Sequence, residues 1–469
     1  MLRVALVAVV SLAQAATAQV VAVTGASVIS MDGDGVLASH TVIVRDGVIA
    51  AVGPDEFIAV PEGAAVVDGS GLFVIPGLGD MHVHFNSPHD ALLNVANGVT
   101  VVRNMWGMPM HVQLREQGRV MPDAWTGDSE SWPVPTIVTA GALIDGEPAI
   151  WDGSASVGNA EDAAAEVRAQ AEAGFDFIKT YSNLSAEAYG AIVEAADEAG
   201  IPFGGHVPQR VGVEAAYSAG QWSNEHLTEY LAGAQRDDSP WRVAVEAGER
   251  MNYYERMIKQ REGLDRDRLA ELGRLSRSRK VWEVPTLIVT KRTFASPTTK
   301  AELLKWDWMK YISAGMRGFW NPANDFRLRD VPAETLEAVE AWFVTELEMA
   351  GILYDAGAEL VVGTDAPNPF VFPGFSVHEE LELFVEAGLS PYRALRAATV
   401  QPSRMLGQKG EFGRVAPGHR GDLVLLRANP LEDILNTREI EGVVLRGRFF
   451  DRDDLNGMLE AAAAFAAEN

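Results

Sequence analysis

The chain of 469 residues has no cysteine, which excludes disulfide bonds, thiolate metal ligands and the attachment of a lipid to a cysteine. It has no run of basic residues, and 65 acidic residues against 39 basic ones give a net charge of -26. Such a charge disfavours binding to nucleic acid and to anionic membranes. After the first twenty residues, no apolar stretch is long enough to span a bilayer. We therefore expect a large soluble protein without nucleic-acid or membrane partners.

The start of the chain has the pattern of a cleavable signal peptide. Met1-Leu2-Arg3 supplies a short positive segment, residues 4–10 are apolar, and residues 16–18 (Ala-Thr-Ala) form a small-residue cleavage site. We expect residues 1–18 to be removed after Ala18, which predicts a periplasmic or secreted protein. The alternative is an apolar edge strand or a loose N-terminus.

The segment Gly79-Asp80-Met81-His82-Val83-His84 follows an apolar run and is the strongest local signal in the chain. Residues i and i+2 of a strand point to the same face, so His82 and His84 could bind one metal ion together. Such a pair could equally be two surface or core histidines. The same pattern recurs, however: single ionisable residues end further short apolar runs, namely Lys179, His206, His226 and Asp365.

The spacing of these residues fits a barrel of eight βα units, which uses roughly 30 residues per unit. Lys179 follows His84 by 95 residues, or three units, and His206 and His226 follow at intervals of one unit each. Asp365 comes 139 residues after His226, which leaves room for two units and a large insertion. This places the six residues on strands one, four, five, six and eight. We expect strands two, three and seven at residues 100–103, 136–140 and 284–289.

The predicted fold class is therefore α/β, a (β/α)8 TIM-like barrel over residues 76–407, with its six candidate ligands at the C-terminal mouth. Helical insertions are expected at about 230–280 and 293–349, either as a lid with aromatic walls or as an oligomer interface. The β-rich flanks, residues 19–75 and 408–455, most simply pair into one small, split β-sandwich domain.

These residues resemble the amidohydrolase superfamily, in the branch that has a lysine on strand four. Further matches to imidazolonepropionase-like proteins and to Xaa-Pro and Xaa-Arg dipeptidases are Gly98-Val99-Thr100, Glu225-His226-Leu227-Thr228 and Gly363-Thr364-Asp365-Ala366. The resemblance implies two divalent metal ions and a Lys179 that reacts with carbon dioxide to form a carbamate bridging both. Imidazoles and a carboxylate suit zinc, and equally manganese, iron, cobalt or nickel.

A protonated lysine cannot bind a cation, so Lys179 must first be neutral, which burial favours. The alternative is an ordinary lysine paired with Asp176 or Glu172. Carbamate, Asp365 and a bridging hydroxide together nearly balance two divalent ions, which supports a binuclear centre. We assign His82, His84 and Asp365 to the more buried ion, and His206 and His226 to the more exposed one.

We expect Asp365 to be the catalytic base and then acid, and the bridging hydroxide to attack the amide bond of a dipeptide or an N-acyl amino acid. The partner is thus a small molecule or a short peptide, and a homo-oligomer is possible. Candidate substrate contacts at the mouth are Arg103, Tyr181 and Tyr230, with Arg210 and Lys291 nearby; each could instead serve in packing or in surface ion pairs.

Other readings remain open at this point. The same fold could act on esters, lactones or phosphotriesters, or could be a deaminase with one metal ion, for which a modified lysine is unnecessary. A catalytically dead scaffold would be signalled by the loss of a ligand, and all six are present.

Overall fold

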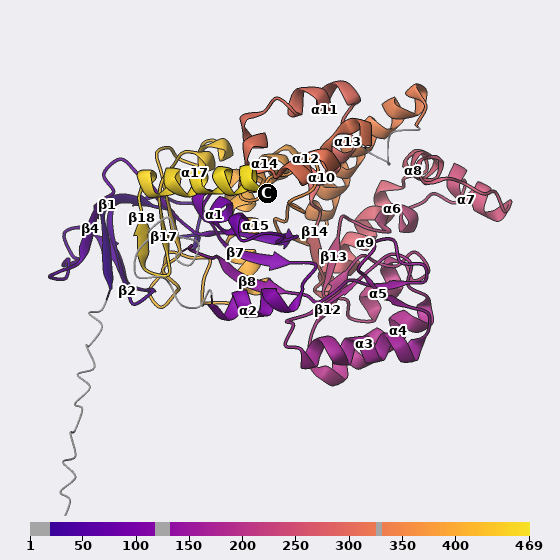
Figure 1. Ribbon diagram of the computed structural model, residues 1–469, viewed down its shortest axis with the longest axis horizontal. Helices are drawn as coiled ribbons and strands as arrows, with labels where there is room; N and C mark the ends of the chain where they lie inside the picture. The colour runs from indigo at the N-terminus through magenta and orange to yellow at the C-terminus, as the bar shows by residue number, and fades with distance from the viewer. Residues whose placement is uncertain (1–18, 118–131, 325–330) are drawn as a thin grey trace, which may run out of the picture.

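The computed structural model describes residues 19–117, 132–324 and 331–469, so the predicted signal peptide, residues 1–18, lies outside the described residues. Figure 1 shows a β-rich region beside a larger region of strands and helices. The C-terminal helix α17 (Arg452–Glu468) packs against helix α1 (His89–Ala96) of the larger region. The two regions are therefore joined by packing as well as by the chain.

The β-rich region combines strands from both ends of the described chain. Strand order in its sheet is β18-β17-β16-β5-β1-β2-β3, with β4 also paired to β1. The two ends meet where β16 runs antiparallel to β5, with Val424 opposite Ile75. All eight strands belong to one sheet, so the expected split β-sandwich is seen only in part. The bounds are β1 (Val20–Val28), β2 (Leu37–Arg45), β3 (Val48–Pro54), β4 (Ala65–Asp68), β5 (Phe73–Pro76), β16 (Leu423–Leu426), β17 (Ile440–Leu445) and β18 (Arg448–Phe450).

The larger region contains two parallel sheets. Strands β6, β7 and β8 form one, and the other has the order β10-β9-β11-β12-β13-β14-β15. Isolated bridges link the two sheets on both sides, at Ala140 with Phe177 and at Val83 with Ala366. The arrangement is consistent with a TIM-like barrel, although the ladder of strands is not continuous and the barrel is not closed. The bounds are β6 (Leu78–Val83), β7 (Val99–Asn104), β8 (Thr136–Thr139), β9 (Ile144–Gly146), β10 (Ala155–Val157), β11 (Ile178–Thr180), β12 (Phe203–Gly205), β13 (Ser223–Glu225), β14 (Trp282–Val284) and β15 (Glu359–Leu360).

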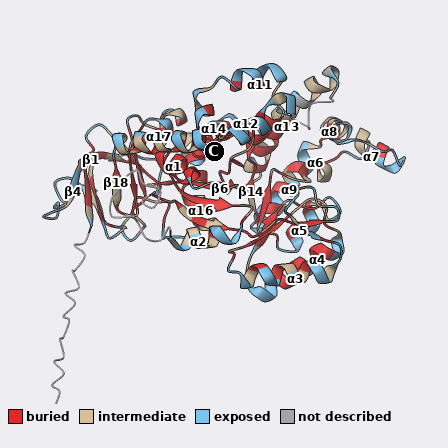
Figure 2. Ribbon diagram, viewed as in Figure 1, coloured by how far each residue is buried: buried red, intermediate tan, exposed pale blue. Residues whose placement is uncertain are grey.

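Helices surround these strands, and Figure 2 shows buried strands inside with exposed helix faces outside. Local capping explains several boundaries: Asn159 and Ser185 accept hydrogen bonds from the first turns of α3 and α4, and Gly200 ends α4 in the left-handed conformation. The helices between α1 and α17 are α2 (Pro109–Gln117), α3 (Ala160–Glu172), α4 (Ala186–Ala199), α5 (Val213–Ser218), α6 (Tyr230–Gly233), α7 (Pro240–Glu246), α8 (Tyr253–Glu262), α9 (Arg266–Arg279), α10 (Leu287–Thr293), α11 (Pro297–Leu303), α12 (Ala314–Trp320), α13 (Ala333–Asp355), α14 (Phe375–Glu386), α15 (Pro391–Ala398) and α16 (Val400–Met405), with short 3-10 turns at η2 (Asp307–Tyr311), η3 (Pro322–Asn324) and η4 (Ile434–Arg438).

The prediction of strand seven at residues 284–289 was wrong in its position. The strand, β14, ends at Val284, and the apolar run after it is the first turn of α10. Two backbone N–H groups of that turn, on Leu287 and Ile288, donate to the Glu380 carboxylate, which caps the helix from α14. A short apolar run does not distinguish a buried helix from a strand, and this cap lies 92 residues away in the sequence.

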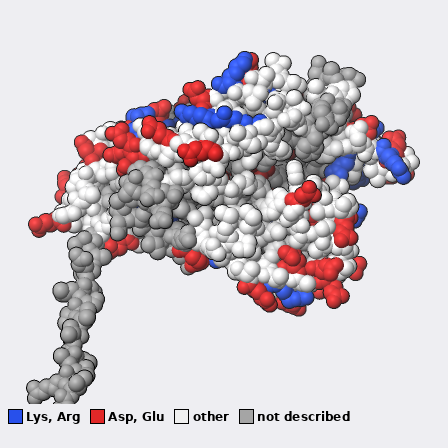
Figure 3. Space-filling view, viewed as in Figure 1, with Lys and Arg blue, Asp and Glu red and all other residues white. Residues whose placement is uncertain are grey.

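The two expected insertions are helical in their described parts. Residues 230–280 form α6 to α9, and α7 and α8 project from the right of the molecule in Figure 1. Residues 293–349 include α11, α12 and the first part of α13. No helix among the described residues is both long and apolar enough to cross a membrane. Acidic side chains outnumber basic ones over much of the face seen in Figure 3.

Candidate metal centre

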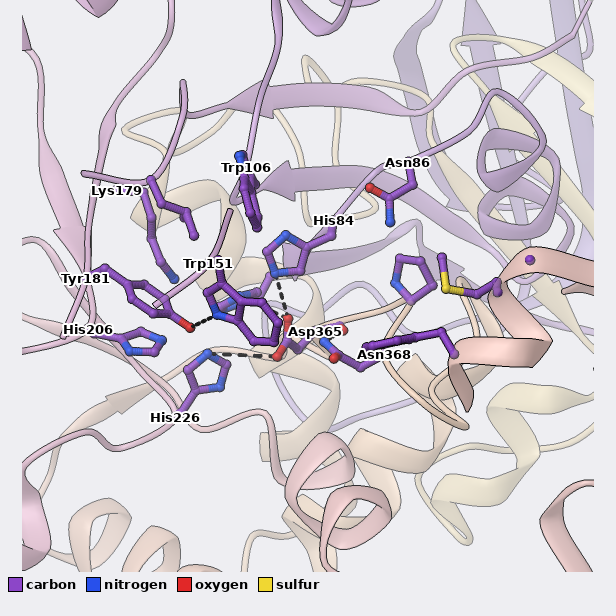
Figure 4. A pocket seen from close by; sticks show the side chains of 16 residues that line it. His84, Asn86, Trp106, Trp151, Lys179, Tyr181, His206, His226, Asp365 and Asn368 are labelled. Atoms are coloured by element: carbon purple, nitrogen blue, oxygen red, sulfur yellow. Dashed lines mark hydrogen bonds and ion pairs between the residues drawn. The ribbon is translucent and has the colours of Figure 1, made fainter. Parts of the chain in front are cut away.

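All six residues predicted as metal ligands line one cavity of about 490 Å³. They come from β6 and the residue after it, from β11, and from the segments that follow β12, β13 and β15. Figure 4 labels five of them around the cavity, namely His84, Lys179, His206, His226 and Asp365, together with Trp151. The structure therefore brings together side chains that are up to 283 positions apart in the sequence, at the C-terminal ends of the parallel strands.

Asp365 lies at the centre of the group. Its Oδ1 is 2.9 Å from His84 Nε2 and 3.4 Å from His82 Nε2, and its Oδ2 is 3.9 Å from His226 Nε2. Burial alone would raise the pKa of Asp365, but the positive charges that His82, His84 and His226 can carry outweigh it, and the pKa lies well below its usual value. Asp365 is therefore an ionised carboxylate surrounded by imidazoles.

The candidate ligand atoms of His82, His226 and Asp365 all lie within 4.8 Å of one another, a spacing that one metal ion could bridge. His82 Nε2 is buried and has no hydrogen-bond partner within the described part of the chain. A buried nitrogen without a partner is costly in a folded protein. A cation at this position would satisfy it, so the residues present fit a metal ion.

Three of the histidines are oriented by a hydrogen bond at Nδ1, which leaves Nε2 as the ring nitrogen available to a metal ion. His82 Nδ1 is 2.7 Å from Glu225 Oε2, His206 Nδ1 is 2.8 Å from Ser182 Oγ, and His226 Nδ1 is 2.6 Å from Thr286 Oγ1. Metal-binding histidines commonly donate their second N–H to such a group, which fixes the ring and leaves the other nitrogen free to bind the ion. Burial lowers the pKa of all three rings, that of His226 to about 4. The neutral form required for metal binding is therefore favoured.

Lys179, on β11, is 1% exposed. Burial lowers its pKa to about 8, although the carboxylates of Glu225 and Asp365 oppose this shift. A side chain at the neighbouring Gly205 would collide with the aliphatic part of Lys179, so glycine is needed there. The alternative pairing with Asp176 is not seen, since Asp176 binds Arg115 and the backbone of Thr139.

Two of the six residues have left-handed backbone conformations, His226 with φ 59° and Asp365 with φ 63°. Non-glycine residues rarely adopt this conformation, and it is often found at functional sites. Hydrogen bonds to neighbouring strands hold both: His226 N donates to Val284 O, and Asp365 N donates to His82 O. The positions of these side chains thus depend on the adjacent strands.

The expectation that Arg103 contacts substrate is not supported by its position. Arg103 is fully buried and does not line the cavity, and its guanidinium donates to Glu225 Oε1, Ser223 Oγ and Met81 O. Its distance to Glu225 is 2.7 Å, and Ser223 also donates to the same oxygen at 2.5 Å. Arg103 therefore belongs to a buried polar network that reaches His82 through Glu225.

Of the other candidate substrate residues, one lines the cavity and the others do not. Tyr181 lines the cavity, stacks on His206 with ring centroids 3.9 Å apart and accepts a hydrogen bond from Trp151 Nε1. Tyr230 is fully buried and donates to Glu283, so it does not line the cavity and the expectation for it is not supported. Arg210 is exposed and does not line this cavity; it lines another hollow, to which Arg256 also belongs. Lys291 lies over the ring of Phe343.

Sequence reasoning gave no role to Glu225, which contacts His82, or to Trp151, Asn368 and Arg256, which line the cavity or the adjoining hollow. A signal for Glu225 exists: an acidic residue in a predicted buried strand needs a buried partner, and Arg103 is the matching charge on another strand. Trp151 and Asn368 lie in irregular segments near the cavity. Arg256 lies on an insertion helix, for which the spacing of barrel strands gives no information.

Comparison with known proteins supports this description. The profile of the amidohydrolase family matches residues 118–450. Imidazolonepropionase from Deinococcus deserti is 42% identical over 86 residues, which is 18% of this chain and 21% of that protein, so the match spans about a fifth of that relative.

Solved structures match over nearly the whole chain. A bottromycin amidohydrolase has a TM-score of 0.73 and 26% identity, with 96% of this chain and 90% of that one covered. A Xaa-Pro dipeptidase has a TM-score of 0.65 and 19% identity, with 92% and 100% covered, which shows the shared fold. The family profile covers most of the chain, and the chain therefore belongs to the amidohydrolase family, whose members are hydrolases acting on C–N bonds and are generally metal-dependent.

Proposed function

We propose that this protein is a binuclear metal-dependent amidohydrolase that cleaves the amide bond of dipeptides or N-acyl amino acids. The observation that carries the proposal is that six residues chosen for metal binding line one cavity. The size of that cavity, about 490 Å³, suits a small ligand. The amide-hydrolysing relatives, a bottromycin amidohydrolase and a Xaa-Pro dipeptidase among them, support an amide substrate.

In this proposal His82, His84 and Asp365 would hold one divalent ion, His206 and His226 would hold the second, and Lys179, as a carbamate, would bind both. Zinc is the first choice for such a ligand set. When bound, the two ions would polarise the substrate carbonyl and lower the pKa of water. The chain itself provides a ligand set without cysteine, of which His82, Lys179 and Asp365 are buried.

The protein residues have separate tasks. Asp365 accepts the proton of the attacking water and delivers it to the nitrogen of the leaving group. Glu225, Ser182 and Thr286 hold the histidine rings in place through their Nδ1 atoms. Tyr181 and Trp151 form part of the wall against which the substrate lies, and the Trp151 Nε1–H donates a hydrogen bond to the Tyr181 hydroxyl at 2.8 Å.

The test combines metal analysis with a substrate screen. Purified protein, loaded with zinc in bicarbonate buffer, should contain two metal ions per chain and hydrolyse dipeptides or N-acyl amino acids faster than esters and lactones of matched structure. Removal of the metal by a chelator should abolish this activity, and zinc with bicarbonate should restore it. One ion per chain together with release of ammonia from an aminated ring would instead support a deaminase, and faster hydrolysis of esters would reject the amide assignment.

A further inference from the structure

A second hollow, of about 350 Å³, adjoins the first at the candidate metal centre. The two hollows share residues on their common boundary, namely Trp151, Tyr181, His206, His226, Asp365 and Asn368. A substrate whose scissile bond lies at the metal centre would thus place the group on one side of that bond in the first hollow and the group on the other side in the second. The side chains that line each hollow then indicate which part of the substrate lies in which hollow.

Beyond the metal ligands the lining of the first hollow is mostly apolar, although Asn86, Asn368 and the hydroxyl-bearing Tyr181 also belong to it. Its apolar side chains include Trp106, Leu143 and Trp151, together with Met316 and Phe319 from α12. Apart from the six candidate ligands, its lining has no Asp, Glu, Lys or Arg among the described residues. Such a wall favours an aromatic or large aliphatic acyl group.

The second hollow has one basic side chain in its described lining, Arg256 on α8. Its Nη2 donates to Glu229 Oε1 at 3.2 Å, and this is the one hydrogen bond that the Arg256 side chain makes within the described part of the chain. A guanidinium has five N–H groups in a planar fork. Most of its donors therefore remain available to a ligand, while Glu229 limits its rotation.

Besides Asp365 on the boundary, two further carboxyl groups, Glu229 and Glu346, line this hollow. Burial raises the pKa of both, that of Glu346 to about 7, although the charge and the hydrogen bond of Arg256 oppose the shift at Glu229. Trp342 Nε1 donates to Glu346 at 3.1 Å. The available donors of Arg256 are thus the main recognition element for an anion in this hollow.

We propose that Arg256 binds the free carboxylate of the leaving amino acid in the second hollow, while the acyl group lies against the tryptophans of the first. The inference rests on the proposed function and deepens it. The enzyme would remove a C-terminal amino acid from an aromatic or large apolar acyl group and would discriminate against substrates whose carboxylate is blocked. Arginine and carboxylate form paired, charge-assisted hydrogen bonds, which a neutral group cannot replace fully.

The first experiment compares N-benzoylglycine with N-benzoylglycinamide, measuring release of benzoate by the zinc-loaded enzyme. The wild type should prefer the free acid, and Arg256→Gln should lower kcat/KM for the acid roughly 10- to 100-fold while changing that for the amide by less than about 3-fold. Arg256→Lys, which keeps the charge but not the fork, should retain part of the preference. Lys259→Gln is the matched control, because Lys259 lies on the same helix outside both hollows and contacts Glu249.

The second experiment measures binding without turnover. In 4-oxo-4-phenylbutanoate the amide nitrogen of N-benzoylglycine is replaced by carbon, so the compound cannot be hydrolysed at that position. Isothermal titration should show that Arg256→Gln raises its Kd roughly 10- to 100-fold and leaves the Kd of 4-oxo-4-phenylbutanamide unchanged.

The outcomes separate this inference from the proposed function. If the wild type hydrolyses the amide bond but treats acid and amide alike, or if Arg256→Gln weakens both equally, Arg256 does not bind the carboxylate and the proposed function stands. If the wild type releases no benzoate from either compound and binds neither ketone, both proposals fail.

Discussion

His82 Nδ1 lies 2.7 Å from Glu225 Oε2, and the other oxygen of Glu225 accepts hydrogen bonds from Arg103 and Ser223. All four side chains are fully buried or nearly so. Burial alone would raise the pKa of Glu225, but the charges of Arg103 and Lys179 outweigh it and the pKa is lowered. Glu225 is thus a buried carboxylate that links the candidate metal ligand His82 to a fixed positive charge.

We predict that Glu225→Gln lowers metal affinity about 10- to 100-fold, because His82 loses a charged partner for its Nδ1 proton. Competition with a chelator measures this change. Ser223→Ala, which removes one hydrogen bond from Glu225 and leaves its charge, should have a smaller effect. A Glu225→Gln protein that binds both ions with unchanged affinity would show that Glu225 does not position His82.

Lys179→Ala should reduce bound metal below two ions per chain and lower amide turnover by roughly 100-fold or more, because the bridging ligand is lost. Inductively coupled plasma mass spectrometry and initial rates measure the two quantities. Lys291→Ala is the control, since Lys291 lies outside both hollows and contacts Phe343. Two ions per chain in Lys179→Ala would contradict a bridging carbamate.

Asp365→Asn should keep part of the metal but lose turnover by about 10²- to 10⁴-fold, because an amide cannot transfer the proton from water to the leaving nitrogen. The backbone of residue 365 still donates to His82 O, so the local fold should be preserved. Steady-state rates and metal content, measured on the same preparation, separate the two effects. Turnover close to that of the wild type would remove Asp365 from proton transfer.

The positions of the six candidate ligands could be predicted because parallel barrel units repeat at regular lengths and place strand ends at one face. His206 and His226, for example, each follow a short β-strand that pairs with its neighbour in the predicted order. A short apolar run that ends in an ionisable residue is a local pattern, so it can be recognised in a single sequence.

The orientation of Arg103 could not be predicted in the same way. It also lies near the end of a strand, but its side chain does not line the cavity, because it donates to the buried Glu225, 122 positions further on. A contact of this kind depends on packing between strands, which local pattern does not specify. Tyr230 shows the same effect, since Glu283 and Tyr217 hold its hydroxyl inside the fold.

His378, on α14, provides a prediction about stability that is independent of the metal centre. Its ring is 1% exposed and lies 3.2 Å from Asn97 O and 3.0 Å from Thr437 Oγ1. Burial, together with the charge of Arg438, lowers its pKa to about 3. In the unfolded chain the value is about 6.5, so the unfolded state binds the additional proton first as the pH falls.

The protonation of His378 should therefore lower the free energy of unfolding as the pH falls from about 6.5 towards 3, and should not change it above pH 6.5. The free energy of unfolding is measured in urea at pH 7 and at pH 4.5, with metal removed from both proteins. Between these two pH values the wild type should lose roughly 2–3 kcal/mol more of this free energy than His378→Gln does, since a pKa difference of one unit corresponds to about 1.4 kcal/mol. His40→Gln, at a partly exposed histidine of the β-rich region, is the control and should behave like the wild type. Equal losses in wild type and His378→Gln would mean that His378 is protonated alike in the folded and unfolded states.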